Sequence, residues 1–197
     1  MNKFKKLIVA AGLMLSISSF TLTNQTEAAT TYTVKSGQTY WKIATGFGIP
    51  LNSLMSANNS KPLIAGQNIT LPNSPISAAD KDLMARLVRA EAVGEPYAGK
   101  VAVAVVILNR VKSDQFPNSV RGVIYQISNG YYAFTPVANG EINKPADAES
   151  KRAVNEAIAL MGKGGGSLFF YNPDTSTNSW ILSRPVTARI GNHVFAR

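Results

Sequence analysis

Glu91 is the residue of this chain whose position best suits acid–base chemistry. It lies seven positions after Met84 on a helical stripe that also contains Leu87 and Val88, so a carboxylate continues an apolar face. Burial at such a place raises the pKa of a carboxyl group, as a general acid acting near neutral pH requires. Periodicity alone also allows a helix-end carboxylate that pairs with Arg86, Arg89 or Arg110, and that arrangement is the commoner one.

The residues after Glu91 predict a corner between two helices. Gly94 suits the left-handed end of the first helix, and Pro96 suits the first turn of the next. Residues 101–108 are apolar on every face, which favours a buried central helix. Glu95 is a possible second acid at this corner, although we favour a structural role such as capping the next helix. We therefore expect Glu91 to face a cleft beside the corner.

The composition excludes several kinds of catalytic site. The chain has no cysteine and a single histidine, His193. A thiol nucleophile or a thiolate metal site is therefore impossible, and a zinc site would lack its usual imidazoles. We expect no metal and no cofactor, and we expect His193 to make a structural hydrogen bond. Carboxylate chemistry is what remains.

The first 28 residues have the pattern of a secretory signal peptide. Lysines at positions 3, 5 and 6 precede an apolar run of 14 residues, and Thr26-Glu27-Ala28 has the form of a cleavage site. The run is shorter than the roughly 20 residues that span a bilayer. We expect secretion with cleavage near Ala28 and no stable membrane insertion; an uncleaved membrane anchor is the alternative.

The formal net charge of the chain is +9, and +7 remains after the three leader lysines and Glu27 are removed. Such a charge favours acidic partners. The lysines and arginines are scattered rather than clustered with aromatic residues, so the sequence indicates attraction to an acidic cell-wall surface rather than to nucleic acid.

Residues 29–72 predict a small unit with the order strand, helix, helix, strand. The strands are expected at 32–34 and 68–71, and the helices at 39–45 and 50–58, with a glycine-rich break between the helices. Trp41 and Phe47 are expected in its core, because large aromatic residues of so small a unit usually fill the interior.

This unit resembles a LysM module through its segments YTVKSGQT, WKIA, LMSANN and GQNITLP, with Tyr40 standing where the family usually has leucine. The resemblance implies binding of N-acetylglucosamine units in peptidoglycan or chitin. It also implies a glycan groove made by Gly37, Gln38, Thr39 and the segment from Asn59 to Ile64. Because residues 29–79 contain no aspartate or glutamate, the module cannot use carboxylate catalysis.

Residues 73–77 predict a short linker, and residues 78–197 a second domain of mainly helical structure with a small sheet. Ser77 and Asp80 form a helix-cap signal at its start. Further helices are expected from 119 to 127 and from 147 to 161, a loop at 128–140, and short strands at 168–171 and 194–195. The fold class that we predict for the whole chain is α+β.

The second domain resembles the cell wall hydrolase family that includes the spore cortex-lytic enzymes. Five segments carry the resemblance in the family's order: RAEAVGEPYAGKVAVAVVILNRV at 89–111, FPNSVRGVIYQ at 116–126, FTPVANG at 134–140, LFFYNP at 168–173 and WILSRPVTARIGNHVF at 180–195. The resemblance implies a lysozyme-related fold and a peptidoglycan substrate. It also implies that the first glutamate of the EAxGEP motif, Glu91, is catalytic.

Members of that family act as lytic transglycosylases, so the resemblance implies cleavage between N-acetylmuramic acid and N-acetylglucosamine with 1,6-anhydro products. Other residues that match the family and could line the cleft are Tyr97, Gln126, Tyr171, Asn172, Trp180 and Arg184. We expect a monomeric enzyme located at the cell wall or the spore. The alternatives are a non-catalytic peptidoglycan-binding protein and a hydrolysing muramidase that uses a second carboxylate.

Overall fold

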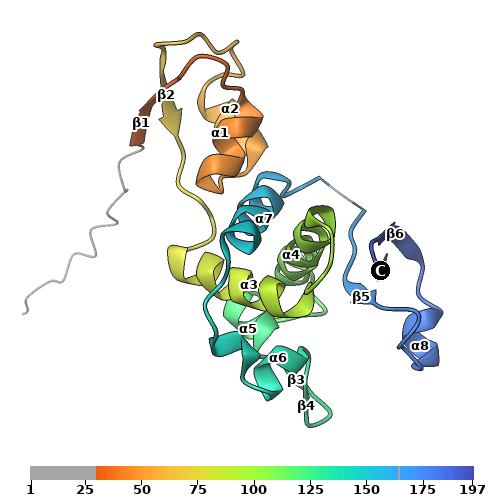
Figure 1. Ribbon diagram of the computed structural model, residues 1–197. Coiled ribbons are helices and arrows are strands. Elements are labelled where there is room, and N and C mark those ends of the chain that lie inside the picture. The colour runs from red at the N-terminus through yellow and green to blue at the C-terminus, as the bar shows by residue number, and fades with distance from the viewer. Residues whose placement is uncertain (1–29, 164) are drawn as a thin grey trace, which may run out of the picture.

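A computed structural model describes residues 30–163 and 165–197. Figure 1 shows a small α/β unit above a larger, mainly helical domain. The predicted signal peptide lies outside the described residues. Within the described part of the chain, no helix is both long and apolar enough to cross a membrane.

The small unit has the predicted order of elements. Its parts are β1 (Thr30–Thr33), α1 (Tyr40–Phe47), α2 (Leu51–Ala57) and β2 (Asn68–Leu71). The two strands are antiparallel, with Tyr32 opposite Ile69. The hydroxyl of Thr39 caps α1 by accepting a hydrogen bond from the Lys42 N–H, and Gly48 ends the helix at a φ of 60°.

The core of the small unit is aliphatic, and it includes a residue from the other domain. Its members are Val34, Ile43, Ala44, Ile49, Leu54, Ile69, Leu71 and, from α7, Ala159. The prediction that Trp41 and Phe47 belong to this core was wrong, because 37% and 43% of their surfaces are exposed. Helices of two turns each bury one face, and small aliphatic side chains already fill the space beneath it.

The second domain contains seven helical segments of varied length and two small sheets in its described part. The helices are α3 (Ala78–Glu91), α4 (Tyr97–Lys112), α5 (Val120–Ile124), α6 (Thr135–Ala138), η1 (Glu141–Asn143), α7 (Ala148–Ala159) and α8 (Ser179–Leu182). The strands are β3 (Ile127–Ser128), β4 (Tyr131–Tyr132), β5 (Phe169–Tyr171), β6 (Val186–Ile190) and β7 (His193–Ala196). The three-stranded sheet has the order β5-β7-β6, and all its pairs are antiparallel.

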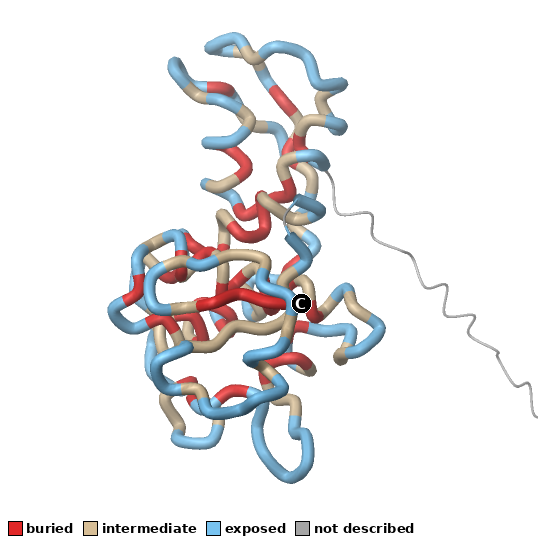
Figure 2. The backbone as a smooth tube through the Cα atoms, turned by 90° about the vertical axis from the view of Figure 1, so that its right-hand side faces the viewer, coloured by how far each residue is buried: buried red, intermediate tan, exposed pale blue. Residues whose placement is uncertain are grey.

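Helix α4 is the centre of this domain, as its apolar sequence predicts. It packs against α3, α5, α7 and β5, and Val103, Val106 and Ile107 are fully buried. Figure 2 shows the buried segments running through the middle of the domain, with exposed loops around them. A buried α4 fixes the position of α3, and therefore of the carboxylate at its end.

The structure differs from the prediction between residues 124 and 140. The predicted helix ends at Ile124 instead of 127, and the predicted loop contains the β3–β4 hairpin and α6. Asn129 and Gly130 make the hairpin turn with φ angles of 52° and 82°. An Asn-Gly pair suits two successive positive φ angles, so the sequence carried a hairpin signal that the prediction of a loop at 128–140 did not use. Helix α8 and strand β6 were not predicted.

Candidate active site

Glu91 is the last residue of α3 and lies at the corner with α4. Ser77 caps the start of this helix by accepting a hydrogen bond from the Asp80 N–H at 3.1 Å. Met84, Leu87 and Val88 are completely buried on its inner face. The stripe predicted from the sequence therefore faces the core, and it carries Glu91 to the edge of that core.

Burial raises the pKa of Glu91 to about 7, and the positive charge of Arg110 partly opposes this effect. The four ion pairs within 4.0 Å among the described residues do not include Glu91. The Glu91 carboxyl group therefore lies near enough to Arg110 to feel its charge, but it does not form an ion pair with it. Near neutral pH it can both donate and accept a proton.

Arg110 is held in place by a carbonyl and by aromatic rings. It is 8% exposed, and its Nε donates a hydrogen bond of 2.8 Å to the Leu168 carbonyl. Its guanidinium carbon lies 4.9 Å from the ring centre of Phe116, 5.1 Å from Phe134 and 5.7 Å from Phe169. Burial lowers the pKa of Arg110 to about 10, while the charge of Glu91 acts in the opposite direction.

The sequence offered Arg110 as one of three arginines that could pair with Glu91, but it did not select Arg110 among the three; in the structure Arg86 pairs with Asp82 and Arg89 with Glu141. A signal was present, because Arg110 is the only charged residue from Val101 to Val111, a run in which Asn109 is the only other polar side chain. A charged residue in such a run is buried with its neighbours and needs partners. Those partners, however, come from distant segments, which no local pattern identifies.

The structure brings two of the predicted cleft residues, Trp180 and Arg184, into the same group of side chains. The Arg184 guanidinium lies 5.1 Å from the Trp180 ring and 5.3 Å from the Phe169 ring. Trp180 in turn meets Phe169 edge to face at 5.1 Å and remains 53% exposed. Phe169 therefore links the exposed tryptophan to Arg110 beside Glu91.

Glu95 has a structural role in this arrangement. Its Oε2 accepts a hydrogen bond from the Asn192 backbone N–H, and its Oε1 accepts one from the Asn192 side chain, both at 3.1 Å. The residue is 9% exposed. At Gly191, any Cβ would collide with the Glu95 carboxylate. The hydrogen bonds of Glu95 thus connect the α3–α4 corner to the β6–β7 turn, and its carboxylate does not cap the helix that follows.

Tyr97 is the first residue of α4, and its hydroxyl contacts α7. Its hydroxyl donates a hydrogen bond of 2.9 Å to Glu156 on α7. Burial, followed by the hydrogen bond to Glu156, raises the pKa of Tyr97 to about 12. The prediction that Tyr97 lines the catalytic cleft finds no support in these contacts, because its hydroxyl is engaged on the side of the domain that meets the small unit.

The other three predicted cleft residues lie on loops and at a strand end. Gln126 stands at the base of the β3–β4 hairpin, where its carbonyl accepts a hydrogen bond from the Ala133 N–H. Tyr171 ends β5 opposite Val194. The Asn172 side chain accepts a hydrogen bond from the Asp174 N–H at 2.9 Å and so shapes its own turn. Substrate binding by these residues stays a prediction.

The small unit has a pocket of about 370 Å³ at the predicted glycan groove. Of the residues predicted there, Gln38 and Thr39 line it, as does the segment from Ser60 to Leu63. Gly37, Asn59 and Ile64 are not among the lining residues. Tyr40 and Met55 line it as well and were not predicted; the Tyr40 hydroxyl donates a hydrogen bond to the Lys61 carbonyl at 2.8 Å.

His193 lies on β7 with its ring 5.3 Å from Phe170 and 6.1 Å from Phe195. Its Nδ1 is buried without a hydrogen-bond partner, so the structural hydrogen bond predicted for this residue is not found at that atom.

Among the residues that the structure describes, no group of three or more histidine, aspartate or glutamate side chains is arranged to hold a metal ion.

Comparison with protein families identifies both parts of the chain. Residues 32–72 match the LysM domain, and residues 94–196 match the cell wall hydrolase family. The second match begins three residues after Glu91, so it covers the central helix and the small sheet but not the carboxylate itself.

The chain is similar to several curated bacterial proteins. It is 48% identical over 125 residues to the spore cortex-lytic enzyme of Halalkalibacterium halodurans, covering 62% of this chain and 37% of that protein. It is 45% identical over 139 residues to the spore cortex-lytic enzyme of Bacillus cereus, covering 71% of this chain and 51% of that protein. The chain therefore matches about half or less of the length of these relatives. It is also 32% identical to the cell wall hydrolase CwlJ of Bacillus subtilis, covering 60% of this chain and 85% of that protein.

Two solved structures show the same fold in the second domain. The catalytic domain of Bacillus cereus SleB has a TM-score of 0.57 and 46% identity, with 64% of this chain and 95% of that chain covered. The catalytic domain of SleB from Bacillus anthracis, described as a germination-specific lytic transglycosylase, has the same score and identity and is covered completely. With its central helix, its corner glutamate and its small sheet, this chain belongs to the cell wall hydrolase family, and it carries a LysM domain ahead of that domain.

Proposed function

We propose that this protein is a peptidoglycan lytic transglycosylase that cleaves the bond between N-acetylmuramic acid and N-acetylglucosamine. The observation that carries the proposal is the state of Glu91, a partly buried carboxyl group at a helix corner whose pKa is raised by burial to about 7. A carboxyl of this kind is protonated often enough to donate and ionised often enough to accept at neutral pH.

Protonated Glu91 would first give its proton to the glycosidic oxygen as the bond from C1 of the muramic residue breaks. The resulting carboxylate would then take the proton from the 6-hydroxyl of the same residue as that oxygen attacks C1. The product is a 1,6-anhydro sugar, and no water is consumed. The positive charge of Arg110 would stabilise the Glu91 carboxylate between the two steps.

A single catalytic carboxylate supports this route over hydrolysis. A glycosidase of the usual kind needs a second carboxylate, about 5 Å away for retention or about 6.5 to 9.5 Å away for inversion. Both oxygens of Glu95 already accept hydrogen bonds from Asn192. Glu141, the acid of η1, is bound to Arg89 and Lys144. A hydrolysing muramidase would require one of these acids to leave its partners.

The LysM domain supports peptidoglycan as the polymer, and the similarity to spore cortex-lytic enzymes supports a place at the spore or the cell wall. A binding domain on the same chain raises the local concentration of further cleavage sites along one polymer. We further propose that the protein acts as a secreted monomer that needs neither metal nor cofactor.

The experiment compares three proteins on purified peptidoglycan and on purified spore cortex: the wild-type chain without residues 1–28, Glu91→Gln and Glu95→Gln. We expect wild type and Glu95→Gln to release soluble fragments, and Glu91→Gln to bind the wall without releasing them. A wild-type protein that binds both walls and cleaves neither would contradict the proposal and favour a non-catalytic wall-binding protein.

A further inference from the structure

The LysM domain packs against the catalytic domain along a surface that we call the seam. The seam is formed by α1, α7 and Lys81 at the start of α3. The Lys81 ammonium on α3 donates a hydrogen bond of 3.0 Å to the Phe47 carbonyl at the end of α1. The Ser74 hydroxyl donates one of 2.6 Å to the Gly48 carbonyl. A cation at the C-terminus of α1 also interacts favourably with the helix dipole.

The backbone at Gly48 approaches the catalytic domain very closely. A Cβ at this position would lie 2.5 Å from Oδ1 of Asn155 and 2.8 Å from Nζ of Lys81. Ala159 of α7 is fully buried in the LysM core. Residues 73–77 therefore join two packed bodies, and the glycan groove of the LysM domain has a defined position relative to Glu91.

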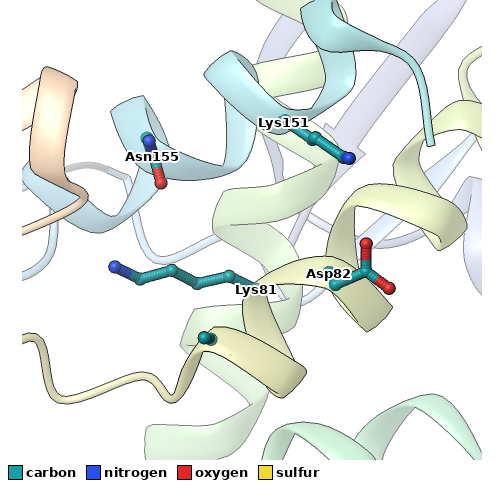
Figure 3. Close-up of a pocket in the computed structure, with 5 residues that line it drawn as sticks. Lys81, Asp82, Lys151 and Asn155 are labelled. Carbon is teal, nitrogen blue, oxygen red and sulfur yellow. The ribbon is translucent and has the colours of Figure 1, made fainter.

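Two pockets near the seam share Asn155 as a lining residue. One has a volume of about 310 Å³ and is lined by Ala78, Lys81, Asp82, Lys151 and Asn155. Figure 3 shows Asn155 and Lys151 on α7 above Lys81 and Asp82 on α3, with the Lys81 ammonium on the side of Asn155 and the Lys151 ammonium directed the opposite way. The second pocket has a volume of about 250 Å³, and Lys42 from α1 and Arg152 from α7 are among its lining residues.

Cationic side chains outnumber acidic ones at these two pockets. The cationic side chains that line them are Lys42, Lys81, Lys151 and Arg152, and none takes part in the four ion pairs found in the described part of the chain. Of the two acids that line the pockets, Asp82 pairs with Arg86 at 3.0 Å. Glu156 accepts a hydrogen bond from the neutral Tyr97 hydroxyl and so keeps its charge, which offsets one of the two cations at the second pocket. The LysM domain can supply no counter-charge, because residues 29–79 contain no acid.

We propose that the seam pockets bind carboxylate groups of the peptide stems that the glycan strand carries, as a third contact beside the LysM groove and the catalytic site. The inference rests on the proposed peptidoglycan substrate. The seam joins the domain that carries the LysM groove to the domain that carries Glu91, so a strand that runs along it from one to the other would bring the carboxylates of its stems to these pockets.

The chemistry of the pockets suits a carboxylate. Lysine ammonium groups and the Asn155 amide can donate hydrogen bonds to its oxygens. Burial lowers the pKa of Lys81, so a bound anion would offset part of the cost of keeping that ammonium charged. Lys151 and Arg152 lie exposed at the rim and are free to reach a stem from solvent.

The test measures binding, with Glu91→Gln in every protein so that no strand is cut. The seam variant adds Lys151→Gln and Arg152→Gln. The matched control adds Arg189→Gln and Arg197→Gln, which remove the same charge from exposed positions on β6 and at the end of the chain. Each protein is sedimented with peptidoglycan that keeps its stems, with glycan strands stripped of stems by an amidase, and with peptidoglycan freed of phosphate polymers by acid.

We expect the seam variant to bind stem-bearing peptidoglycan about threefold to tenfold more weakly than its parent, as two partly exposed charge contacts allow. The loss should persist after phosphate polymers are removed and should disappear on stripped glycan, while the control should bind like its parent throughout. Equal losses in both variants, a loss that remains on stripped glycan, or a loss that vanishes with the phosphate polymers would each overturn the inference. If the parent itself binds none of the three materials, it is the proposed function that fails.

Discussion

At the scale of single residues, Glu91 experiences two opposing effects. Burial favours its neutral form, while the charge of Arg110 favours the ionised form, and burial is the larger of the two. The balance leaves the pKa at about 7 instead of the ordinary value of 4.5. Because the carboxyl pKa is higher in the folded state than in the unfolded state, the free energy of unfolding falls as the pH rises from 4.5 to about 7.

Replacing Glu91 by glutamine should therefore stabilise the protein at high pH while abolishing activity. The folded state binds a proton that the unfolded state releases between pH 4.5 and about 7, so the cost is absent below pH 4.5 and complete above pH 7. We expect Glu91→Gln to gain up to about 3 kcal/mol in free energy of unfolding at pH 8 and nothing at pH 4. Urea denaturation at both pH values measures this. A variant that is less stable at pH 8 would show that the Glu91 carboxylate is stabilised in the fold.

Removing the charge of Arg110 should move the pH dependence of activity. Without the cation, burial alone acts on Glu91 and raises its pKa further, so the alkaline limb of the rate profile should shift to higher pH. Arg110→Met should show this shift, and Arg110→Lys, which keeps the charge, should show less of it. The profile of kcat against pH measures the effect. An unchanged alkaline limb in a folded Arg110→Met protein would mean that Glu91 does not set it.

At the scale of elements, the contact between Glu95 and Asn192 joins the helix corner to the sheet. Glu95→Gln replaces one acceptor oxygen by a donor that faces the N–H groups of Asn192. We expect a loss of about 1 to 3 kcal/mol in stability, because a buried donor is left unpaired. Activity per folded molecule should fall far less than in Glu91→Gln. A folded Glu95→Gln protein as inactive as Glu91→Gln would instead make Glu95 a second catalytic acid.

The sequence predicted those elements whose patterns are local. The stripe from Met84 to Glu91 and the apolar run of α4 identified two helices and the catalytic candidate, because helix periodicity shows directly which face is buried. Arg110 and the Asn192 contact were not predictable in the same way. Their roles depend on Phe134 and Leu168 in the first case and on a turn 97 residues away in the second.

At the scale of the whole molecule, the seam makes the two domains one packed body. Gly48→Ala would place a methyl group against Asn155 and Lys81 at a φ that alanine disfavours. We expect a loss of about 1 to 3 kcal/mol in stability and a separate, earlier melting of the LysM domain. Gly46→Ala is the matched control, since a Cβ there meets nothing within 4 Å and alanine favours the helix. Calorimetry that shows a single unchanged transition for Gly48→Ala would contradict a tight seam.

The central claim is that one carboxylate, Glu91, cleaves the glycan strand without water. The most direct measurement is mass spectrometry of the fragments that the protein without residues 1–28 releases from peptidoglycan and from cortex, before and after borohydride reduction, with Glu91→Gln as the control. The account predicts fragments that resist reduction and weigh one water less than hydrolytic products, and none from Glu91→Gln. Reducible fragments carrying the added water would contradict it and would make this protein a hydrolase.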